Sequence, residues 1–253
     1  MSALSIAAVR ERLADLTGDA LAAEIAALAG DDRAGVRAAV ESAKKREERR
    51  LAELARLEKM SEFERKYASL GPICGMDEAG RGPLAGPVVA AAVVLPEGCL
   101  IPYVNDSKQL SEKRREELYD VIMEKALSVG VGMASPERID QINILQADYE
   151  AMREAVSKLT VRPAVFLNDA VTVPGLAGKQ VAIVKGDARS ISIAAASIIA
   201  KVTRDRLMKQ YDELFPEYGF AGHKGYGSAQ HIAKLKELGP CPIHRRSFIG
   251  HFV

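Results

Sequence analysis

The sequence predicts an α/β protein with a central mixed sheet of about five strands flanked by helices, preceded by an N-terminal helical extension. Two observations predict this class. Residues 1–70 contain no proline and are rich in Ala, Leu, Glu, Arg and Lys. From Gly71 onward, short apolar runs alternate with segments of helical periodicity. We therefore expect two domains, a helical extension over residues 1–70 and an α/β domain over residues 71–253.

The helical extension is predicted from apolar residues at helical spacing, such as Leu51, Leu54 and Leu57. We expect two short helices and then a longer one from about Ala34 to Leu57 or beyond. The charged segment Lys44–Arg50 is interpreted as a solvated helix surface, with a phosphate-contacting patch as the alternative.

The α/β domain is predicted element by element from its periodicity. Five apolar runs are expected to be strands: Ile73–Asp77, Val88–Leu95, Leu127–Met133, Val165–Leu167 and Val181–Val184. Four periodic segments are expected to be helices: Ser111–Lys125, Ile144–Leu159, Ile191–Leu214 and Ala229–Leu238. Three strands come early and single strands then alternate with helices, which favours both antiparallel and parallel neighbours.

Composition limits the classes of function. The longest apolar runs are too short to span a membrane, and no signal peptide is evident at the N-terminus. Three cysteines without framework spacing suggest reduced thiols and a cytoplasmic location. A net charge of +1 gives no general attraction to nucleic acid. The span 185–209 nevertheless holds six basic and two acidic residues, a local surplus of +4.

Four acids follow apolar runs, a pattern that indicates a metal site. Asp77 and Glu78 are expected to close the first strand, and Asp169 and Asp187 follow the fourth and fifth. Acids at the ends of strands in one sheet can converge on one edge, where uncompensated carboxylates would repel one another. Ligation by oxygen alone suits Mg²⁺ or Mn²⁺.

Other motifs fit less well. The loop after Glu78 has glycines at 80, 82 and 86, but its spacing and the prolines at 83 and 87 are wrong for a dinucleotide-binding loop. No phosphate-binding G-x-x-x-x-G-K-[ST] loop occurs. Cys241 and His244 lack a second pair that would complete a zinc site.

The segment Asp77–Pro87 resembles the N-terminal signature of the ribonuclease HII family. Arg81 stands where the sister family, ribonuclease HIII, typically has threonine, so the resemblance is to HII. The matching blocks continue in the family's order to the C-terminus: Asp106–Lys108, Gly186–Asp187, Ser192–Asp205, His223–Gly227 and His244–Phe248.

The resemblance implies a ribonuclease H-like fold in which Asp77, Glu78, Asp169 and Asp187 are catalytic and hold two Mg²⁺ or Mn²⁺ ions. Such an enzyme hydrolyses the RNA strand of RNA–DNA hybrids and nicks duplex DNA on the 5′ side of a single embedded ribonucleotide. The paired ions activate water and stabilise the departing oxygen, leaving 5′-phosphate and 3′-hydroxyl ends. No membrane and no obligate protein partner is expected.

The resemblance also implies substrate-binding residues. Backbone groups of Gly80, Arg81 and Gly82 would read the 2′-hydroxyl that separates RNA from DNA. Tyr226 would stack on the following deoxyribose, or else be a loop aromatic with a packing role. Phosphate contacts are expected from the helix that begins near Ser190 and from three side chains: Ser107, Lys108 and Lys224.

Two other functions remain as alternatives. A structure-selective DNA nuclease of related fold would use a similar acidic cluster. A non-enzymatic nucleic-acid-binding module would work through the helical extension and would not need Asp77. The extension itself either enlarges a duplex-binding surface or packs on the catalytic domain.

Overall fold

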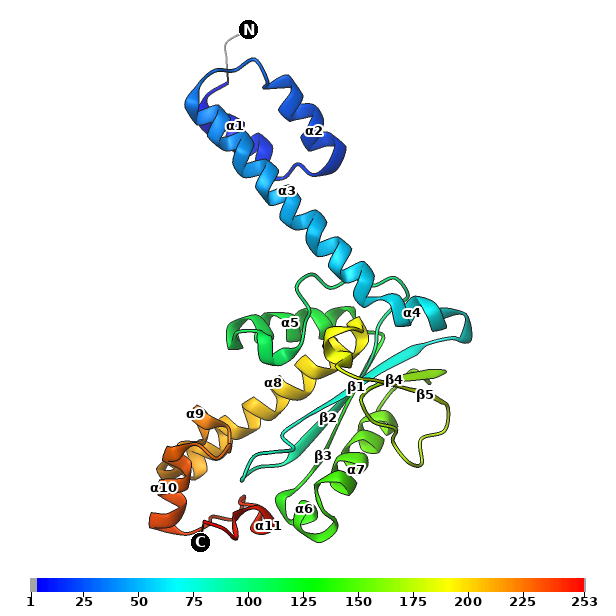
Figure 1. The fold of residues 1–253 in the computed structure, drawn as a ribbon, viewed down its shortest axis with the longest axis vertical. Helices are drawn as coiled ribbons and strands as arrows, with labels where there is room; N and C mark the ends of the chain where they lie inside the picture. Colours follow the sequence, from blue (N-terminus) through cyan, green and yellow to red (C-terminus); the bar gives the residue numbers. More distant parts are fainter. Residues whose placement is uncertain (1–3, 253) are drawn as a thin grey trace. The chain divides into compact units, whose positions relative to one another are not determined.

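The computed structural model describes residues 4–252, and the chain divides into two compact units after Leu57. The first unit contains α1 (Ile6–Ala14), α2 (Gly18–Ala27) and the start of α3 (Ala34–Met60). The Ser5 hydroxyl accepts a hydrogen bond from Ala8 N at 3.2 Å and thereby caps α1. These helices confirm the predicted N-terminal helical region (Figure 1).

The first unit has a small apolar core and uses part of the charged segment Lys44–Arg50 to hold itself together. The core is formed by one face of each helix: Val9, Leu13, Leu21, Val36, Ala39 and Ala43. Arg46 donates to the carbonyls of Leu13 and Leu16 at 2.7 and 2.9 Å. Glu47 accepts from Gly18 N and pairs with Arg50 at 2.7 Å. Lys45 and Arg49 are exposed and form no ion pair with residues 4–252.

The second unit is built on a five-stranded sheet of order β3-β2-β1-β4-β5. Antiparallel pairing joins β1 to β2 and β2 to β3, and parallel pairing joins β1 to β4 and β4 to β5. The mixed sheet predicted from the sequence is therefore confirmed. The strands are β1 (Ile73–Ala79), β2 (Val88–Val94), β3 (Ser128–Ala134), β4 (Val165–Asp169) and β5 (Lys179–Ile183).

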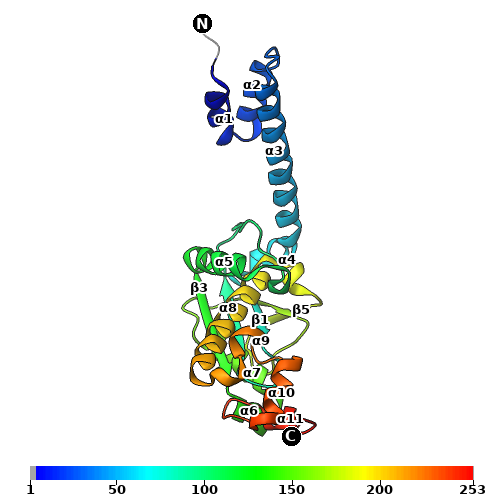
Figure 2. The ribbon, with the colours of Figure 1, turned by 90° about the vertical axis from the view of Figure 1, so that its left-hand side faces the viewer.

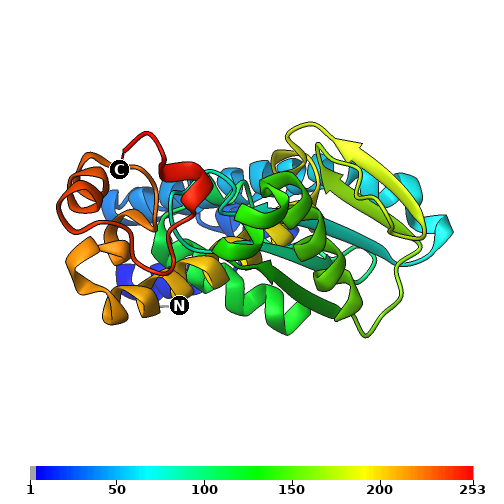
Figure 3. The same ribbon diagram turned by 90° about the horizontal axis from the view of Figure 1, so that it is seen from below.

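Helices cover both faces of this sheet (Figures 1 and 3). Helix α7 (Ile144–Ser157) packs on β2 and β3, and α8 (Ile191–Leu214) packs on the opposite face against β1 and β2. Both contacts are very close. A Cβ atom at Gly75 would lie 2.1 Å from the main chain of Ser192, and one at Gly132 would lie 2.1 Å from Ala151 O. Glycine and alanine at these contacts allow the helix axes to approach the sheet.

The other elements surround this core. Helix α5 (Glu112–Lys125) packs on α8, and α6 precedes α7. Helices α9, α10 and α11 lie together at the C-terminal end of α8 (Figure 2). The remaining bounds are α4 (Glu62–Tyr67), η1 (Ala68–Leu70), η2 (Ser107–Gln109), α6 (Pro136–Ile142), η3 (Gly186–Ala188), η4 (Pro216–Tyr218), α9 (Phe220–His223), α10 (Ala229–Leu238) and α11 (Arg246–Ile249).

The strand ends differ from the sequence-based expectation at one important place. The prediction ended the first strand at Asp77, but β1 continues to Ala79 because Asp77, Glu78 and Ala79 pair with the buried strand β2. None of the helices between residues 4 and 252 combines the length and apolar character that a membrane span requires. The domain boundary at residue 70 stays a prediction.

Candidate active site

The register of the sheet brings Asp77 and Asp169 together. In the parallel pair β1–β4, Met76 lies opposite Asn168, so the two acids are the next residues along neighbouring strands. Asp169 is the last residue of β4 and also pairs with Ile183 of β5. The site is thus built at the edge where the parallel strands end, as the sequence predicted for Asp169.

Asp187 is tied to the same edge through the main chain. It lies in the short helix η3, directly after β5, and is 7% exposed. The N–H of Gly186 donates to Asp169 Oδ1 at 2.7 Å. This bond fixes the turn that carries Asp187 to the end of β4, so Asp169 and Asp187 lie at the same edge of the sheet although they are 18 positions apart in sequence.

Asp77 and Glu78 point to opposite faces of the sheet because both are inside β1, which corrects the predicted strand end. Asp77 lies on the α8 face, where Ser197 donates a hydrogen bond to it. Glu78 lies on the α7 face, toward Asp148 and Arg81. The two carboxylates therefore approach the end of β4 from two sides.

The electrostatics of the site are unfavourable for negative charge. Burial raises the pKa of Asp77 well above its usual range, and the charges of Glu78 and Asp169 raise it further. Burial likewise raises the pKa of Glu78, an effect that Arg81 opposes. Burial and the charges of nearby acids raise the pKa of Asp187 to about 6. A divalent cation would relieve this repulsion.

The residues fit an oxygen-liganded cation in their chemistry. Glu78 Oε2 is buried without a hydrogen-bond partner, which leaves a carboxylate oxygen available. Within residues 4–252, no three His, Cys, Asp or Glu side chains are gathered into a ligating arrangement. Carboxylates in a poorly solvated site repel one another, so a bound cation would draw them closer together.

Lys108 is a basic side chain that interacts electrostatically with several acids of the site. Burial would lower its pKa, but the surrounding carboxylates outweigh burial and raise the pKa instead: Asp106, Asp77, Asp187 and Glu78. The ammonium group therefore stays charged beside the site. This position fits the predicted role of Lys108 in binding a phosphate at the acidic edge.

The other predicted phosphate contacts differ in exposure. Ser107 is 3% exposed, and its hydroxyl shares a hydrogen bond of 2.9 Å with the hydroxyl of Ser197. Lys224 is 9% exposed, and its ammonium group donates to Ala221 O. In this arrangement Ser107 links α8 to the loop that carries Lys108, and Lys224 fastens the loop that carries Tyr226.

Tyr226 stands out from its loop and is 45% exposed. The guanidinium group of Arg204 lies 5.8 Å from the centroid of its ring. Its carbonyl accepts from His231 Nδ1 at 2.9 Å. One face of the ring is thus supported by the protein while the side chain remains accessible, as stacking on a sugar requires.

The glycine loop, defined here as residues 80–87, needs glycine at two positions for steric reasons. Gly80 has φ +95°, and a Cβ there would lie 2.0 Å from Arg204 Nε. Gly86 has φ +87°, and a Cβ there would lie 2.4 Å from Met208 Sδ. Gly82 has no positive φ, and a Cβ there would meet open space. The fold therefore does not require glycine at position 82.

Asp148 is an acid of the site that sequence reasoning missed. It is fully buried, both of its carboxylate oxygens lack hydrogen-bond partners, and Arg81 Nε lies 3.7 Å from Oδ2. Burial and the charge of Glu78 raise its pKa to about 8. A signal was available, because Asp148 falls on the apolar stripe of α7 with Ala147, Ala151 and Met152.

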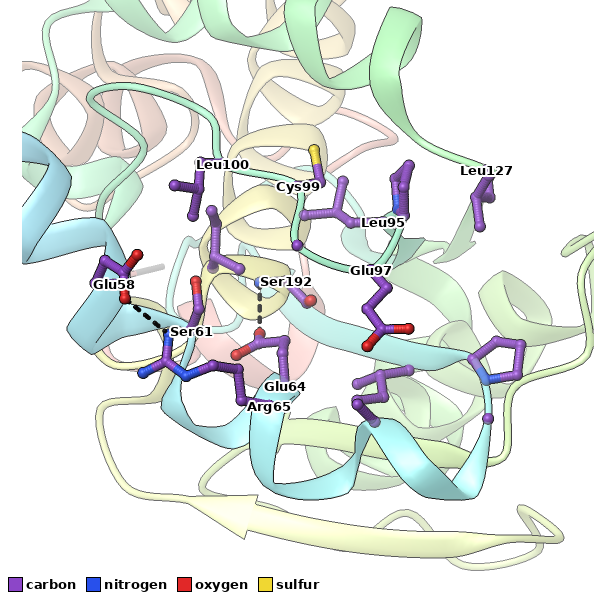
Figure 4. Close-up of a pocket in the computed structure, with 17 residues that line it drawn as sticks. Glu58, Ser61, Glu64, Arg65, Leu95, Glu97, Cys99, Leu100, Leu127 and Ser192 are labelled. Atoms are coloured by element: carbon purple, nitrogen blue, oxygen red, sulfur yellow. Dashed lines mark hydrogen bonds and ion pairs between the residues drawn. The ribbon is translucent and has the colours of Figure 1, made fainter.

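Glu64 is a second residue that was missed, and it holds the start of α8 in place. Its Oε1 accepts from Ser190 Oγ at 2.6 Å. It also accepts from Ser192 N at 3.0 Å (Figure 4). A carboxylate at this position satisfies free N–H groups and interacts favourably with the helix dipole. Because Ser190 ends the turn that begins at Gly186, Glu64 supports the position of Asp187 from outside the acidic cluster.

Beside Glu64 lies a cavity of about 460 Å³, lined by residues of α4, the loop after β2 and the start of α8 (Figure 4). None of the four predicted acids lines it. The presence of this cavity therefore does not identify the active site, and the acids at the edge of the sheet are the better candidate.

Comparison with known proteins identifies the chain. The ribonuclease HII family profile matches residues 74–251, and the profile of the ribonuclease HII N-terminal domain matches residues 5–68. Ribonuclease HII of Lachnoclostridium phytofermentans is 64% identical over 219 residues, covering 87% of this chain and 86% of that protein. Ribonuclease HII of Enterococcus faecalis is 48% identical over 250 residues, covering 98% and 97%.

Among solved structures, ribonuclease H2 from Pyrococcus horikoshii is similar, with a TM-score of 0.58 and 30% identity over 70% of this chain and 93% of that one. The predicted ribonuclease H-like fold and the predicted resemblance are both confirmed. The chain belongs to the ribonuclease HII family and is an endonuclease.

Proposed function

We propose that this enzyme hydrolyses the RNA strand of RNA–DNA hybrids and nicks duplex DNA on the 5′ side of a single embedded ribonucleotide. The observation that supports the proposal is that Asp77 and Glu78 of β1, Asp169 at the end of β4 and Asp187 in the turn after β5 lie at one edge of the sheet. Membership of the ribonuclease HII family supports the same activity.

Two Mg²⁺ or Mn²⁺ ions would be held by these four acids, activating water and stabilising the departing 3′-oxygen. The chain's own residues orient the substrate. Lys108 attracts a phosphate to the acidic edge, and the exposed ring of Tyr226 supports a sugar next to the scissile bond. Backbone groups of Gly80, Arg81 and Gly82 contact the 2′-hydroxyl of the ribonucleotide.

The test is a nicking assay on a DNA duplex containing one ribonucleotide, with Mg²⁺ or Mn²⁺ present. We expect a cut on the 5′ side of the ribonucleotide, and Asp77→Asn should abolish cutting while largely sparing duplex binding. An equal rate on an all-DNA duplex would favour a structure-selective DNA nuclease instead. Cutting that persists in excess chelator would contradict the role of metal ions.

The N-terminal unit is proposed to enlarge the duplex-binding surface. Lys45 and Arg49 carry the proposal, because they are exposed on one face of α3 at i, i+4 spacing. In the full-length chain, Lys45→Glu with Arg49→Glu should weaken duplex binding more at low than at high salt. Unchanged affinity at every salt concentration would leave a packing role as the explanation. We also propose that the enzyme acts in the cytoplasm, as the three cysteines without framework spacing suggest.

A further inference from the structure

Two buried arginines donate hydrogen bonds to the main chain of the glycine loop. Arg204 of α8 is 1% exposed and Arg245 is fully buried. Neither forms an ion pair with an acid among residues 4–252, and their guanidinium groups donate only to main-chain carbonyls. Burying a charge in this way is costly, and the hydrogen bonds to main-chain carbonyls offset part of that cost.

Arg245 binds the start of the loop. Its Nη2 donates to Gly80 O at 2.6 Å and its Nη1 to Arg81 O at 2.9 Å. Its Nε and Nη2 also donate to Gly86 O at 2.9 and 2.8 Å. The side chain thus joins both ends of the loop with four hydrogen bonds, across more than 150 positions of sequence.

These bonds also determine the direction of two N–H groups. In a planar trans peptide the C=O and the N–H point in opposite directions, and no cis peptide occurs among the described residues. The carbonyl of Gly80 shares its peptide with the N–H of Arg81, and the carbonyl of Arg81 shares its peptide with the N–H of Gly82. With both carbonyls turned toward Arg245, both N–H groups point away from it.

Those two N–H groups are free, whereas others in the loop are not. The N–H groups of Leu84 and Gly86 donate to Gly225 O and Ile243 O, each at 2.8 Å. Within residues 4–252, the N–H groups of Arg81 and Gly82 form no hydrogen bond. A pair of adjacent, unpaired and similarly directed donors beside the acidic edge is suited to an oxygen acceptor.

We propose that Arg245 is a positioning residue that determines specificity for ribonucleotides. By holding the carbonyls of Gly80 and Arg81, it directs the N–H groups of Arg81 and Gly82 to the 2′-oxygen of the substrate. This inference rests on the proposed function. Lysine cannot replace this planar fork, because an ammonium group is a single point donor on a flexible stem.

The experiment compares binding to two duplexes that differ by one hydroxyl group. The parent is Asp77→Asn, which holds substrate without cutting it. We measure the Kd for a duplex with a single ribonucleotide and for the same all-DNA duplex, and take the ratio of the all-DNA Kd to the ribonucleotide Kd. Adding Arg245→Lys should reduce the ratio about 10- to 100-fold, as expected for two misdirected hydrogen bonds, with little change in affinity for all-DNA duplex.

Arg204→Lys is the matched control, because Arg204 is equally buried and binds carbonyls of the same loop, those of Ala85 and Pro87. Because Arg204 also supports the Tyr226 ring, whose sugar contact is present in both duplexes, we expect this variant to weaken binding of both duplexes equally and to lower the melting temperature. The Kd ratio of the parent should then stay within about twofold. An unchanged ratio in Arg245→Lys, or an equal loss of the ratio in both variants, would overturn the proposal.

If Arg245→Lys does not fold, hydrogen exchange in the parent protein provides the test. The amides of Arg81 and Gly82 should exchange rapidly in the free protein and slowly with the ribonucleotide duplex, but not with the all-DNA duplex. Equal protection by both duplexes would contradict the inference. Failure of the proposed function is distinguishable, because the unmodified enzyme would then not nick a single-ribonucleotide duplex at all.

Discussion

His231 Nε2 lies 2.9 Å from His244 Nε2, in a chain of hydrogen bonds that requires both imidazoles to be neutral. His244 Nδ1 accepts from Cys241 N, so His244 carries its proton on Nε2 and donates it to His231. His231 then donates from Nδ1 to the carbonyl of Tyr226. We assign these tautomers from the partners, and they tie the Tyr226 loop to the C-terminal segment.

Acid should therefore destabilise this histidine pair. Burial and, to a lesser degree, the neighbouring His231 lower the pKa of His244 to about 4. The unfolded chain binds more protons than the folded one between about pH 4 and 6.5, so stability falls as pH falls through this window. Between pH 6.5 and 5, this effect amounts to about 2 kcal/mol.

Urea unfolding of the wild type and of His244→Asn at several pH values between 7 and 5 measures this effect as a difference. The comparison with the wild type is needed because the carboxyl groups with raised pKa values titrate in the same pH window. Their titration increases stability as the pH falls, which is opposite to the effect of His244. His251→Asn is the control, since His251 is exposed. Parallel pH profiles for wild type and His244→Asn would contradict the prediction.

Gly82→Ala should separate substrate binding from folding. A Cβ at this position meets open space and the backbone has no positive φ, so the free energy of unfolding should change by less than about 1 kcal/mol. The added methyl group would stand where the main chain contacts the sugar, so KM for the ribonucleotide duplex should rise at least about tenfold. Gly80→Ala should instead destabilise the fold, because Arg204 occupies the space. A normal KM for Gly82→Ala would argue against close contact.

Asp148→Asn should stabilise the protein at alkaline pH. The folded-state pKa of about 8 lies far above the usual value of 3.8, so the folded state binds more protons over this range and loses stability as pH rises toward 8. Removing the charge should recover part of this loss, at most about 6 kcal/mol above pH 8. Chemical unfolding at pH 5 and pH 8.5 measures the gain, with the exposed Asp120→Asn as control. A gain of equal size at both pH values would show that the charge is not responsible.

Asp77→Asn should have opposite effects on the metal-free and metal-bound protein. Without metal it removes a buried carboxylate from a repulsive cluster, so the melting temperature should rise by a few degrees. With millimolar Mn²⁺ the wild type should be stabilised and the variant should gain little. Thermal melts with and without chelator give both values. An equal Mn²⁺ response in the two proteins would place the cation elsewhere.

Glu64→Ala should weaken the start of α8. Loss of the two hydrogen bonds from Ser190 and Ser192 should cost about 1 to 2 kcal/mol of unfolding free energy. Glu64→Gln should lose less, since the amide oxygen can still accept. Glu62→Ala, on the exposed side of the same helix, is the control. Equal losses for Glu62→Ala and Glu64→Ala would mean that capping is not the cause.

Local sequence patterns were sufficient to predict the fold class and the order of the strands along the chain, and they also led to the four acids proposed for the site. Those features depend on local properties. Apolar periodicity marks each strand and helix, and the acids follow the apolar runs directly. The Asp77–Pro87 motif carried the family assignment for the same reason, since its residues are contiguous.

The contacts between distant residues depend on how the whole chain folds. Asp77 and Glu78 lie on opposite faces because pairing with β2 carries β1 on to Ala79, which local pattern could not reveal. Asp148, Glu64 and Arg245 join the site from other elements, through contacts between residues 67 to 165 positions apart. Their roles arise from burial and from hydrogen bonds to main-chain atoms, and neither is encoded by neighbours in sequence.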